Sequence, residues 1–170
     1  MDRTHYKKLF RAAAIQLHKE KFTERGLEIA VDVVLDSVCL KVYKKSWANP
    51  AIDPVTSASR VFFSVWVNES SIANQRICYN IHALKLRQLK GYKIQSRQFA
   101  EVFRASFKNF EANWPNVSVD FGPQTLMEGW VNFEVDNIES NVAKLANNFL
   151  EIENLIDATL AKFEAQVSMV

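Results

Sequence analysis

Glycine is scarce in this chain, with only four among 170 residues. Loops that hold phosphate groups need glycines at fixed spacing, because the backbone must approach the ligand closely. Neither the GxGxxG pattern of dinucleotide-binding folds nor the GxxxxGK[ST] pattern of triphosphate-binding loops occurs. The sequence therefore excludes the common glycine-rich nucleotide sites, and we expect no cofactor.

Long apolar runs are also missing, since none approaches the ~20 residues needed to span a bilayer. The N-terminal stretch, MDRTHYKKLFRAAAIQLHKEKF, is charged throughout and lacks the unbroken apolar core of a signal peptide. The two cysteines, Cys39 and Cys78, are typical of free thiols in a reducing compartment. We therefore expect a cytoplasmic protein with no membrane partner.

Catalytic and metal-binding motifs are absent as well. There is no GxSxG, CxxC or HExxH. Cys78 and His82 lie four residues apart, or roughly 13 Å along a strand at ~3.3 Å per residue, which is too far for a catalytic pair. We expect no catalytic residue and no metal ligand. An enzyme remains a third hypothesis, with its site built from distant residues such as the hairpin carboxylates Asp120, Glu128 and Glu134.

The bulk composition is that of an ordinary globular protein, with 48% hydrophobic and 24% charged residues. A chain of this length suits one domain, and no linker or repeat divides it. The net charge of +2 is too weak to imply a nucleic-acid or membrane partner by itself. We expect a single domain over residues 1–170.

Three segments have the apolar periodicity of helices. Residues 3–21 place apolar side chains at three- and four-residue spacing. Residues 96–113 carry a stripe of phenylalanines, and Pro115 ends that helix. Residues 138–167 keep the spacing to the end of the chain and form the strongest helix. The phenylalanine stripe consists of Phe99, Phe103, Phe107 and Phe110.

Other segments alternate as strands do. Residues 60–68 read as a central strand, and residues 76–89 as a strand whose change of phase indicates a bulge. Residues 117–121 and 126–135 are typical of a hairpin. Residues 27–43 fit either a strand or a helix. Their valines favour a strand, with a break or bulge near Asp36 and Ser37.

The resulting order is α-β-β-β-α-β-β-α, which predicts an α+β fold. About five strands form an antiparallel sheet, packed by N-terminal, middle and long C-terminal helices. This order resembles the small secretion-chaperone fold, although the resemblance covers element order alone. Members of that group are typically acidic dimers, whereas this chain is mildly basic.

Residues 84–104 hold six cationic side chains and a single anionic one, Glu101. The strand end, the turn and the following helix would form one continuous positive surface, which we call the basic corner. An exposed tyrosine among cations could stack on a nucleic-acid base. The alternative is an ordinary solvated face. Its candidate anion- or nucleic-acid-binding residues are Lys85, Arg87, Lys90, Tyr92, Lys93, Arg97 and Arg104.

One long loop, residues 46–59, contains two prolines and many small residues. Loops of that length are often functional. Trp47 adjoins this loop and Trp114 ends a predicted helix. Both could therefore line a ligand pocket near the ends of elements. Trp66, in the central strand, and Trp130, in the predicted hairpin, are most simply core residues.

The C-terminal helix suggests a partner. Thirty helical residues span roughly 45 Å at ~1.5 Å per residue, whereas a domain of this size has a radius of gyration of about 15 Å. Its second half would lack a cover within the chain, unless the N-terminal helix provides one. The predicted interface residues are Ile152, Ile156, Leu160 and Phe163.

These observations favour a small non-enzymatic protein that acts by binding protein, as an adaptor or chaperone. The partner would be a second copy, in a homodimer through the C-terminal helix, or another protein. The alternative is a nucleic-acid-binding accessory protein that uses the basic corner at residues 85–108.

Overall fold

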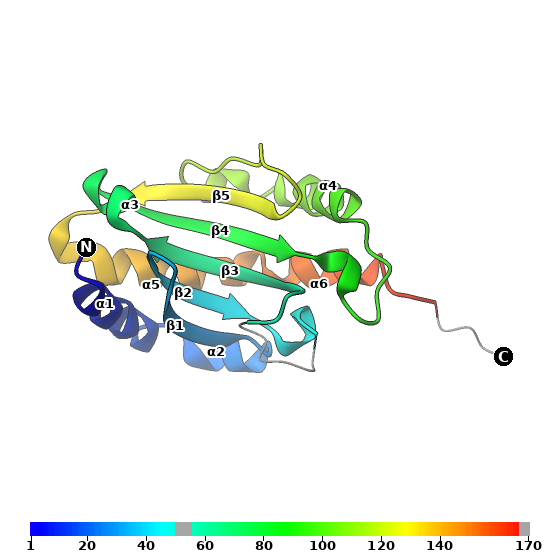
Figure 1. Ribbon diagram of the computed structural model, residues 1–170, viewed down its shortest axis with the longest axis horizontal. Helices are drawn as coiled ribbons and strands as arrows, with labels where there is room; N and C mark the ends of the chain where they lie inside the picture. The colour runs from blue at the N-terminus through cyan, green and yellow to red at the C-terminus, as the bar shows by residue number, and fades with distance from the viewer. Residues whose placement is uncertain (50–55, 167–170) are drawn as a thin grey trace.

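The computed structural model describes residues 1–49 and 56–166. It contains a five-stranded antiparallel sheet whose strands are arranged in chain order (Figure 1). The predicted α+β class and antiparallel sheet are confirmed. The strands are β1 (Glu28–Val34), β2 (Ser37–Tyr43), β3 (Arg60–Val67), β4 (Arg76–Leu84) and β5 (Thr125–Asn132).

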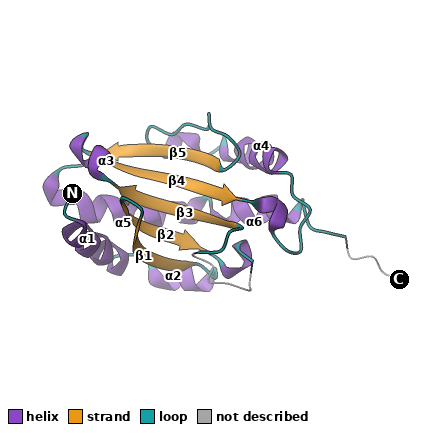
Figure 2. Ribbon diagram, viewed as in Figure 1, coloured by secondary structure: helices purple, strands orange, loops and turns teal. Residues whose placement is uncertain are grey.

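The helices that cover the sheet lie mainly on one of its faces (Figure 2). The helix α1 packs on α5 and on the first two strands, and α4 packs on α6 and β5. In the part of the chain that the structure describes, no helix crosses the other face (Figure 2). The helices are α1 (Arg3–Ile15), α2 (Lys19–Glu24), α3 (Glu69–Ala73), α4 (Ser96–Phe107), α5 (Ile138–Asn148) and α6 (Glu153–Ala161).

The core fills the space between the sheet and these helices. Alternate residues of β3 point into it because side chains of a strand alternate between its two faces. Phe63 stacks on Phe149 with ring centroids 4.5 Å apart. The phenylalanine stripe of α4 also packs there, since Phe103 and Phe107 are fully buried.

Residues 27–43 form a hairpin rather than one interrupted strand. The strands β1 and β2 pair from Glu28–Tyr43 to Val34–Ser37, and Leu35 and Asp36 make the turn between them. The predicted break near Asp36 is therefore this turn and not a bulge. Leu35 has a φ of +54° and is 89% exposed, so a large apolar residue occupies a position that glycine or asparagine normally takes.

The predicted hairpin of residues 117–121 and 126–135 is only partly present. The strand β5 pairs with β4, while Ser118 makes one isolated bridge to Glu128. The change of phase expected in residues 76–89 appears as a shift of register between Ile81 and His82.

Both long predicted helices are broken. The first ends at Ile15, and a second short helix begins at Lys19, which lets Phe22 enter the core. The last is interrupted by a 3₁₀ turn at Phe149–Glu151, so α5 and α6 are separate helices. Residues 50–55 of the long loop and Val167 lie outside the described residues.

Candidate functional site

The basic corner retains five exposed cations: Lys85, Arg87, Lys90, Lys93 and Arg97. Among the described residues, none of the five forms an ion pair. Lys85 adopts a left-handed conformation with a φ of +47°, which turns the chain from β4 into a 3₁₀ turn at Leu86–Gln88. The chain thus presents these charges to solvent, as the sequence predicted.

Arg104 has a structural role within the chain. Its guanidinium donates hydrogen bonds to the carbonyl oxygens of Leu126, Phe121, Gly122 and Thr125, at 2.9 to 3.1 Å. Those bonds hold α4 to the turn before β5, so Arg104 does not belong to the basic corner.

Tyr92 is half-buried and its segment is fixed in place. The chain around it exchanges backbone hydrogen bonds with the C-terminal segment, from Lys93 N–H to Phe163 and from Ala165 N–H to Gly91. Burial raises the pKa of Tyr92, with smaller contributions from Glu164 and Asp157. The tyrosine is therefore less free to stack on a base than the sequence suggested.

The premise of the predicted C-terminal interface is wrong. Ile152, Ile156 and Leu160 are buried within the chain, so their stripe does have an intramolecular cover. Phe163 is half-buried and packs against Phe99 with ring centroids 5.9 Å apart. Much of the cover comes from α4, which packs against α6. A homodimer would have to use another surface.

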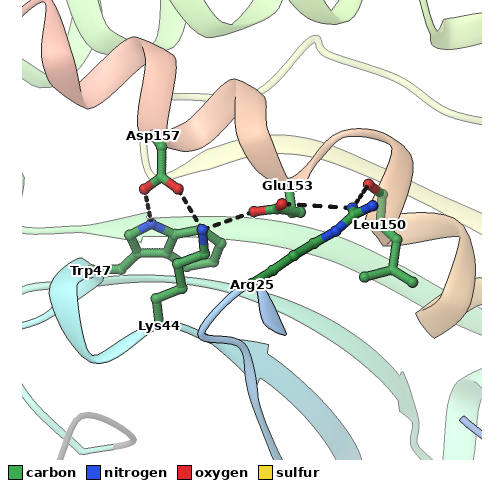
Figure 3. Close-up of polar contacts among 6 residues, drawn as sticks. All are labelled: Arg25, Lys44, Trp47, Leu150, Glu153 and Asp157. Carbon is green, nitrogen blue, oxygen red and sulfur yellow. Dashed lines mark hydrogen bonds and ion pairs between the residues drawn. The ribbon is translucent and has the colours of Figure 1, made fainter. Parts of the chain in front are cut away.

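A polar cluster fixes α6 to the chain from its other side (Figure 3). Asp157 accepts hydrogen bonds from Trp47 Nε1, at 2.8 Å, and from Lys44 Nζ. Lys44 also contacts Glu153 at 3.0 Å. Burial lowers the pKa of Lys44, but the hydrogen bonds and charges of Asp157 and Glu153 together outweigh burial and raise it.

The same cluster explains how the chain tolerates the break before α6. Arg25 Nη1 donates a hydrogen bond to the carbonyl of Leu150, which lies in the 3₁₀ turn (Figure 3). The helix break leaves carbonyls without intrahelical partners, and this bond satisfies one of them.

The two tryptophans proposed for a pocket are core residues. Trp47 is fully buried and lies edge-on to Phe149. Trp114 is 2% exposed and packs against Tyr79 and Phe63. Neither side chain lines an open site.

A groove of about 740 Å³ lies between α2 and α5. Its lining includes His18, Lys21, Arg25 and Lys144, but not His82 or the hairpin carboxylates. The groove therefore does not collect the groups that an enzyme built from those residues would need. Within residues 1–49 and 56–166, no group of three or more histidine, cysteine and acidic side chains could hold a metal ion.

The helix-free side of the sheet, which we call the open face, has an unusual composition. Side chains of paired residues form three rows across the strands of this face. The outermost row contains two tryptophans separated by a cysteine, since Trp66 pairs with Cys78 and Cys78 with Trp130. Arg76 lies over the Trp130 ring, with 3.8 Å between the guanidinium carbon and the ring centroid. Paired strands are ~4.8 Å apart, so the tryptophans stand roughly 10 Å from each other above Cys78.

The middle row of the open face is polar. Lys41 pairs with Ser64, Ser64 with Asn80, and Asn80 with Glu128, so four polar side chains cross four strands. Lys41, Ser64 and Asn80 are each at least 94% buried, because they are 6%, 3% and 3% exposed. Asn80 Nδ2 donates to Glu128 Oε1 at 3.1 Å.

The third row is aromatic. Phe62 pairs with His82, and their ring centroids are 5.4 Å apart. Lys41 Nζ lies 4.7 Å and the Arg60 guanidinium carbon 5.1 Å from the centroid of the Phe62 ring. Burial lowers the pKa of His82 and so favours the neutral imidazole. A hydrogen bond to the Gln124 carbonyl acts in the opposite direction but is outweighed.

Several polar groups on the open face lack partners among the described residues. Lys41 has no ion pair there, and burial together with Arg60 lowers its pKa. Asn80 Oδ1 and Trp66 Nε1 are buried atoms that form no hydrogen bond. Buried polar groups are normally satisfied, so such unpaired groups on one surface mark a functional candidate.

The cysteines of the open face do not have the properties of nucleophiles. Burial raises the pKa of Cys39, and burial with Glu128 raises that of Cys78 to about 11. Reactive cysteines need the opposite shift, because the thiolate is the attacking species. The arrangement therefore favours binding over covalent chemistry.

Sequence reasoning did not identify the open face. In each strand, the residues of the open face are those that alternate with the apolar core positions. In β3 they are Phe62, Ser64 and Trp66. The partly apolar faces of residues 60–68 predict a central strand, which β3 is. The core position expected for Trp66 and Trp130 is wrong, because both lie partly exposed on the open face. Locating the uncovered face required the helix arrangement, which strand periodicity does not give.

No family model, no curated protein and no solved structure matches the chain. The resemblance to the secretion-chaperone fold thus rests on element order alone. No helix among the described residues is long and apolar enough to cross a membrane.

Proposed function

We propose that this is a non-enzymatic protein-binding module, of the adaptor or chaperone kind, and that the open face is where a partner protein docks. The observation that carries the proposal is the buried polar row on a sheet face that no described helix covers. The two free thiols, Cys39 and Cys78, favour a cytoplasmic location.

The side chains around the polar row are those that dominate protein interfaces. Tryptophan, tyrosine and arginine are enriched at binding hot spots because they combine a large apolar surface with hydrogen-bond donors. The open face holds Trp66, Trp130, Arg60 and Arg76 in and beside its aromatic rows. A partner that covers Trp66 could also accept a hydrogen bond from its indole N–H.

The polar row calls for specific groups on that partner. An unpaired buried ammonium is unfavourable, and a carboxylate or carbonyl above Lys41 would compensate it. A donor above Asn80 would satisfy its free oxygen. A peptide surface offers both kinds of group, since each residue carries an N–H and a carbonyl.

The charge of the open face favours protein over nucleic acid as the ligand. Its three strong cations are matched in number by three carboxylates, and a polyanion would meet both signs. A protein surface of mixed charge complements such a face better. The cations are Lys41, Arg60 and Arg76, and the carboxylates are Glu28, Asp32 and Glu128.

Photo-crosslinking tests this proposal. A photoreactive benzophenone amino acid in place of Trp66 should give a discrete protein adduct when the native host is irradiated. The same group in place of Ile15, which is 72% exposed on α1, is the matched control and should give none. A nuclease-sensitive adduct at Trp66, or equal labelling at both positions, would contradict a protein-binding open face.

Nucleic-acid binding is a second candidate, favoured by the five exposed cations of the basic corner. Each lysine or arginine that contacts a phosphate releases counterions, so binding should fall steeply with salt. Changing Lys85, Arg87, Lys90 and Lys93 together to glutamine should weaken binding to all sequences and flatten the salt dependence. If the unchanged protein binds neither DNA nor RNA at low salt, this second candidate is wrong.

A further inference from the structure

The edge strand β1 is less buried than any other strand of the sheet. None of its seven residues is fully buried, whereas each of the other four strands has several that are. Ile29, Val31 and Val33 pack against the core but stay only half-buried. An apolar strand at the edge of a sheet is therefore left partly uncovered.

The opposite edge of the sheet is protected. Ser118 and Glu128 exchange two backbone hydrogen bonds, of 2.8 and 3.0 Å, along the outer side of β5. Arg104 donates hydrogen bonds to the carbonyl oxygens of Leu126 and Thr125. Backbone groups that would otherwise invite another strand are thus occupied along β5.

The strand β1 has no comparable protection. Among the described residues, no backbone hydrogen bond joins β1 to any segment outside the β1–β2 ladder. Val33 N–H donates instead to the carboxylate of Asp32, at 2.8 Å. Natural edges are usually blocked by charged side chains, above all lysine, or by proline or a bulge. The strand EIAVDVV has no lysine, proline or bulge, and its two charges, Glu28 and Asp32, belong to the open face.

We propose that β1 pairs antiparallel with β1 of a second copy, with Val31 on the two-fold axis. Two five-stranded sheets would then join into one continuous sheet of ten strands. A strand that pairs antiparallel with itself is two-fold symmetric, so one seam satisfies the free edges of both copies.

The register follows from the outward backbone groups. Since Val33 N–H bonds a side chain rather than β2, Val33 belongs to the set whose backbone groups point outward. Ladder positions alternate, so Val31 and Ile29 belong to it too. A seam centred on Val31 brings outward groups opposite one another.

This register also matches the side chains. Ile29 of one copy faces Val33 of the other, and Val31 faces Val31, which extends the half-buried apolar strip across the seam. Asp32 faces Ala30 and Glu28 faces Val34, so no like charges are opposed. Cross-strand pairs of β-branched residues stabilise sheets, whereas directly opposed like charges destabilise them.

The seam uses the free backbone edge of β1, whereas the docking surface uses side chains of the open face, so the seam goes beyond the proposed function. Its consequence is that the two open faces become neighbours on one sheet. A partner with two copies of its binding segment could then engage both, and the second contact would be intramolecular.

The oligomeric state of the full chain tests the proposal. Sedimentation at micromolar concentration should show a dimer for the wild type. Ala30→Asp places acidic groups opposite Asp32 on both sides of the axis and should shift the protein to monomer. Within the chain Ala30 pairs with Lys41, so an acidic residue there does not oppose a like charge from β2.

Rescue distinguishes the seam from an indirect effect. Adding Asp32→Lys to Ala30→Asp turns both acidic pairs into complementary ones and should restore the dimer. Under mild oxidation Val31→Cys should also form a disulfide between copies, because residues opposed on the axis lie ~5.5 Å apart at Cα. Val33→Cys, which faces Ile29, should not.

A monomeric wild type, or a dimer that survives Ala30→Asp, would overturn the seam. Either result leaves the Trp66 crosslinking experiment unaffected, because that experiment does not depend on a second copy. Conversely, an absent Trp66 adduct would leave the sedimentation results standing.

Discussion

The middle of the open face is buried almost as fully as the covered face, but by different means. On the covered face, Phe63 is fully buried beneath α5 and its aromatic neighbours. On the open face, Phe62 is 6% exposed although no described helix crosses it (Figure 2). Its cover consists of Lys41, Arg60 and His82, whose side chains lie against its ring.

The difference lies in what else is buried with each aromatic ring. Apolar groups on the covered face need nothing from their neighbours beyond close packing. The open face buries the Asn80 side-chain oxygen and the Trp66 indole N–H, and neither has a hydrogen-bond partner among the described residues. Low exposure alone therefore does not identify a core. Two unpaired polar atoms, Asn80 Oδ1 and Trp66 Nε1, lie together on the open face, although the core also leaves Trp114 Nε1 without a partner among the described residues.

The largest loss of folding stability is expected for a charge placed on the covered face, in α6. Ile156→Asp would bury a carboxylate in the covered face, where Ile156 is fully buried. The cost should reach about 4 kcal/mol or more, because nothing there can pair with the charge. Circular dichroism and urea titration should show an unfolded or severely destabilised chain. A folded variant that is merely monomeric would instead revive the C-terminal interface.

A second test compares aromatic side chains on the two faces. Phe103→Ala should cost ~3–5 kcal/mol, since Phe103 is fully buried under the sheet and stacks on Phe107. Trp66→Ala, on the open face, should cost less, about 2 kcal/mol, because part of its ring stays exposed. Urea denaturation of both variants measures the difference. Equal costs would mean that the open face is ordinary core.

The covered face could be predicted from the sequence because its signal is periodic. The phenylalanines of residues 96–113 and the alternation of residues 60–68 each mark one side of an element. Those positions are where the structure packs Phe99, Phe103 and Phe63. Burial of apolar groups follows the local pattern here, so no knowledge of distant contacts was needed.

The breaks in the chain could not be predicted in the same way. The turn at Leu35 and Asp36 lacks the glycine or asparagine that usually marks a two-residue hairpin. The interruption at Phe149–Glu151 keeps an apolar spacing that fits an unbroken helix. Arg25, far away in sequence, satisfies a carbonyl at that interruption, and periodicity carries no information about such a contact.

The open face was missed for a related reason. Lys41 and Asn80 look like ordinary solvent-facing residues in a sequence, because polar positions in strands usually face water. Their burial arises from large neighbours on adjacent strands, and it became visible only when the strand register placed Phe62 beside Lys41.

The smallest expected effect concerns Lys41 itself. Lys41 is 6% exposed and forms no ion pair among the described residues. Lys41→Met removes its charge and keeps much of the side-chain volume, so it should stabilise the fold by about 1–2 kcal/mol at neutral pH. The matched control is Lys45→Met, whose side chain is 77% exposed and paired with Glu28. That exposed pair contributes little, so the control should change stability by less than about 0.5 kcal/mol.

The dependence of this gain on pH follows from the lowered pKa of Lys41. In the folded chain its pKa lies below the ordinary value of 10.5, because burial and Arg60 disfavour the charge. Between the folded and the unfolded pKa the unfolded state binds more protons, so the free energy of unfolding of the wild type rises with pH. The advantage of Lys41→Met should therefore be greatest at neutral pH and shrink as pH approaches 10.5. Urea titrations of the wild type and of Lys41→Met at several pH values measure this difference in stability. A variant less stable than wild type at neutral pH would show that Lys41 supports the fold, and the open face would lose its clearest mark of a binding surface.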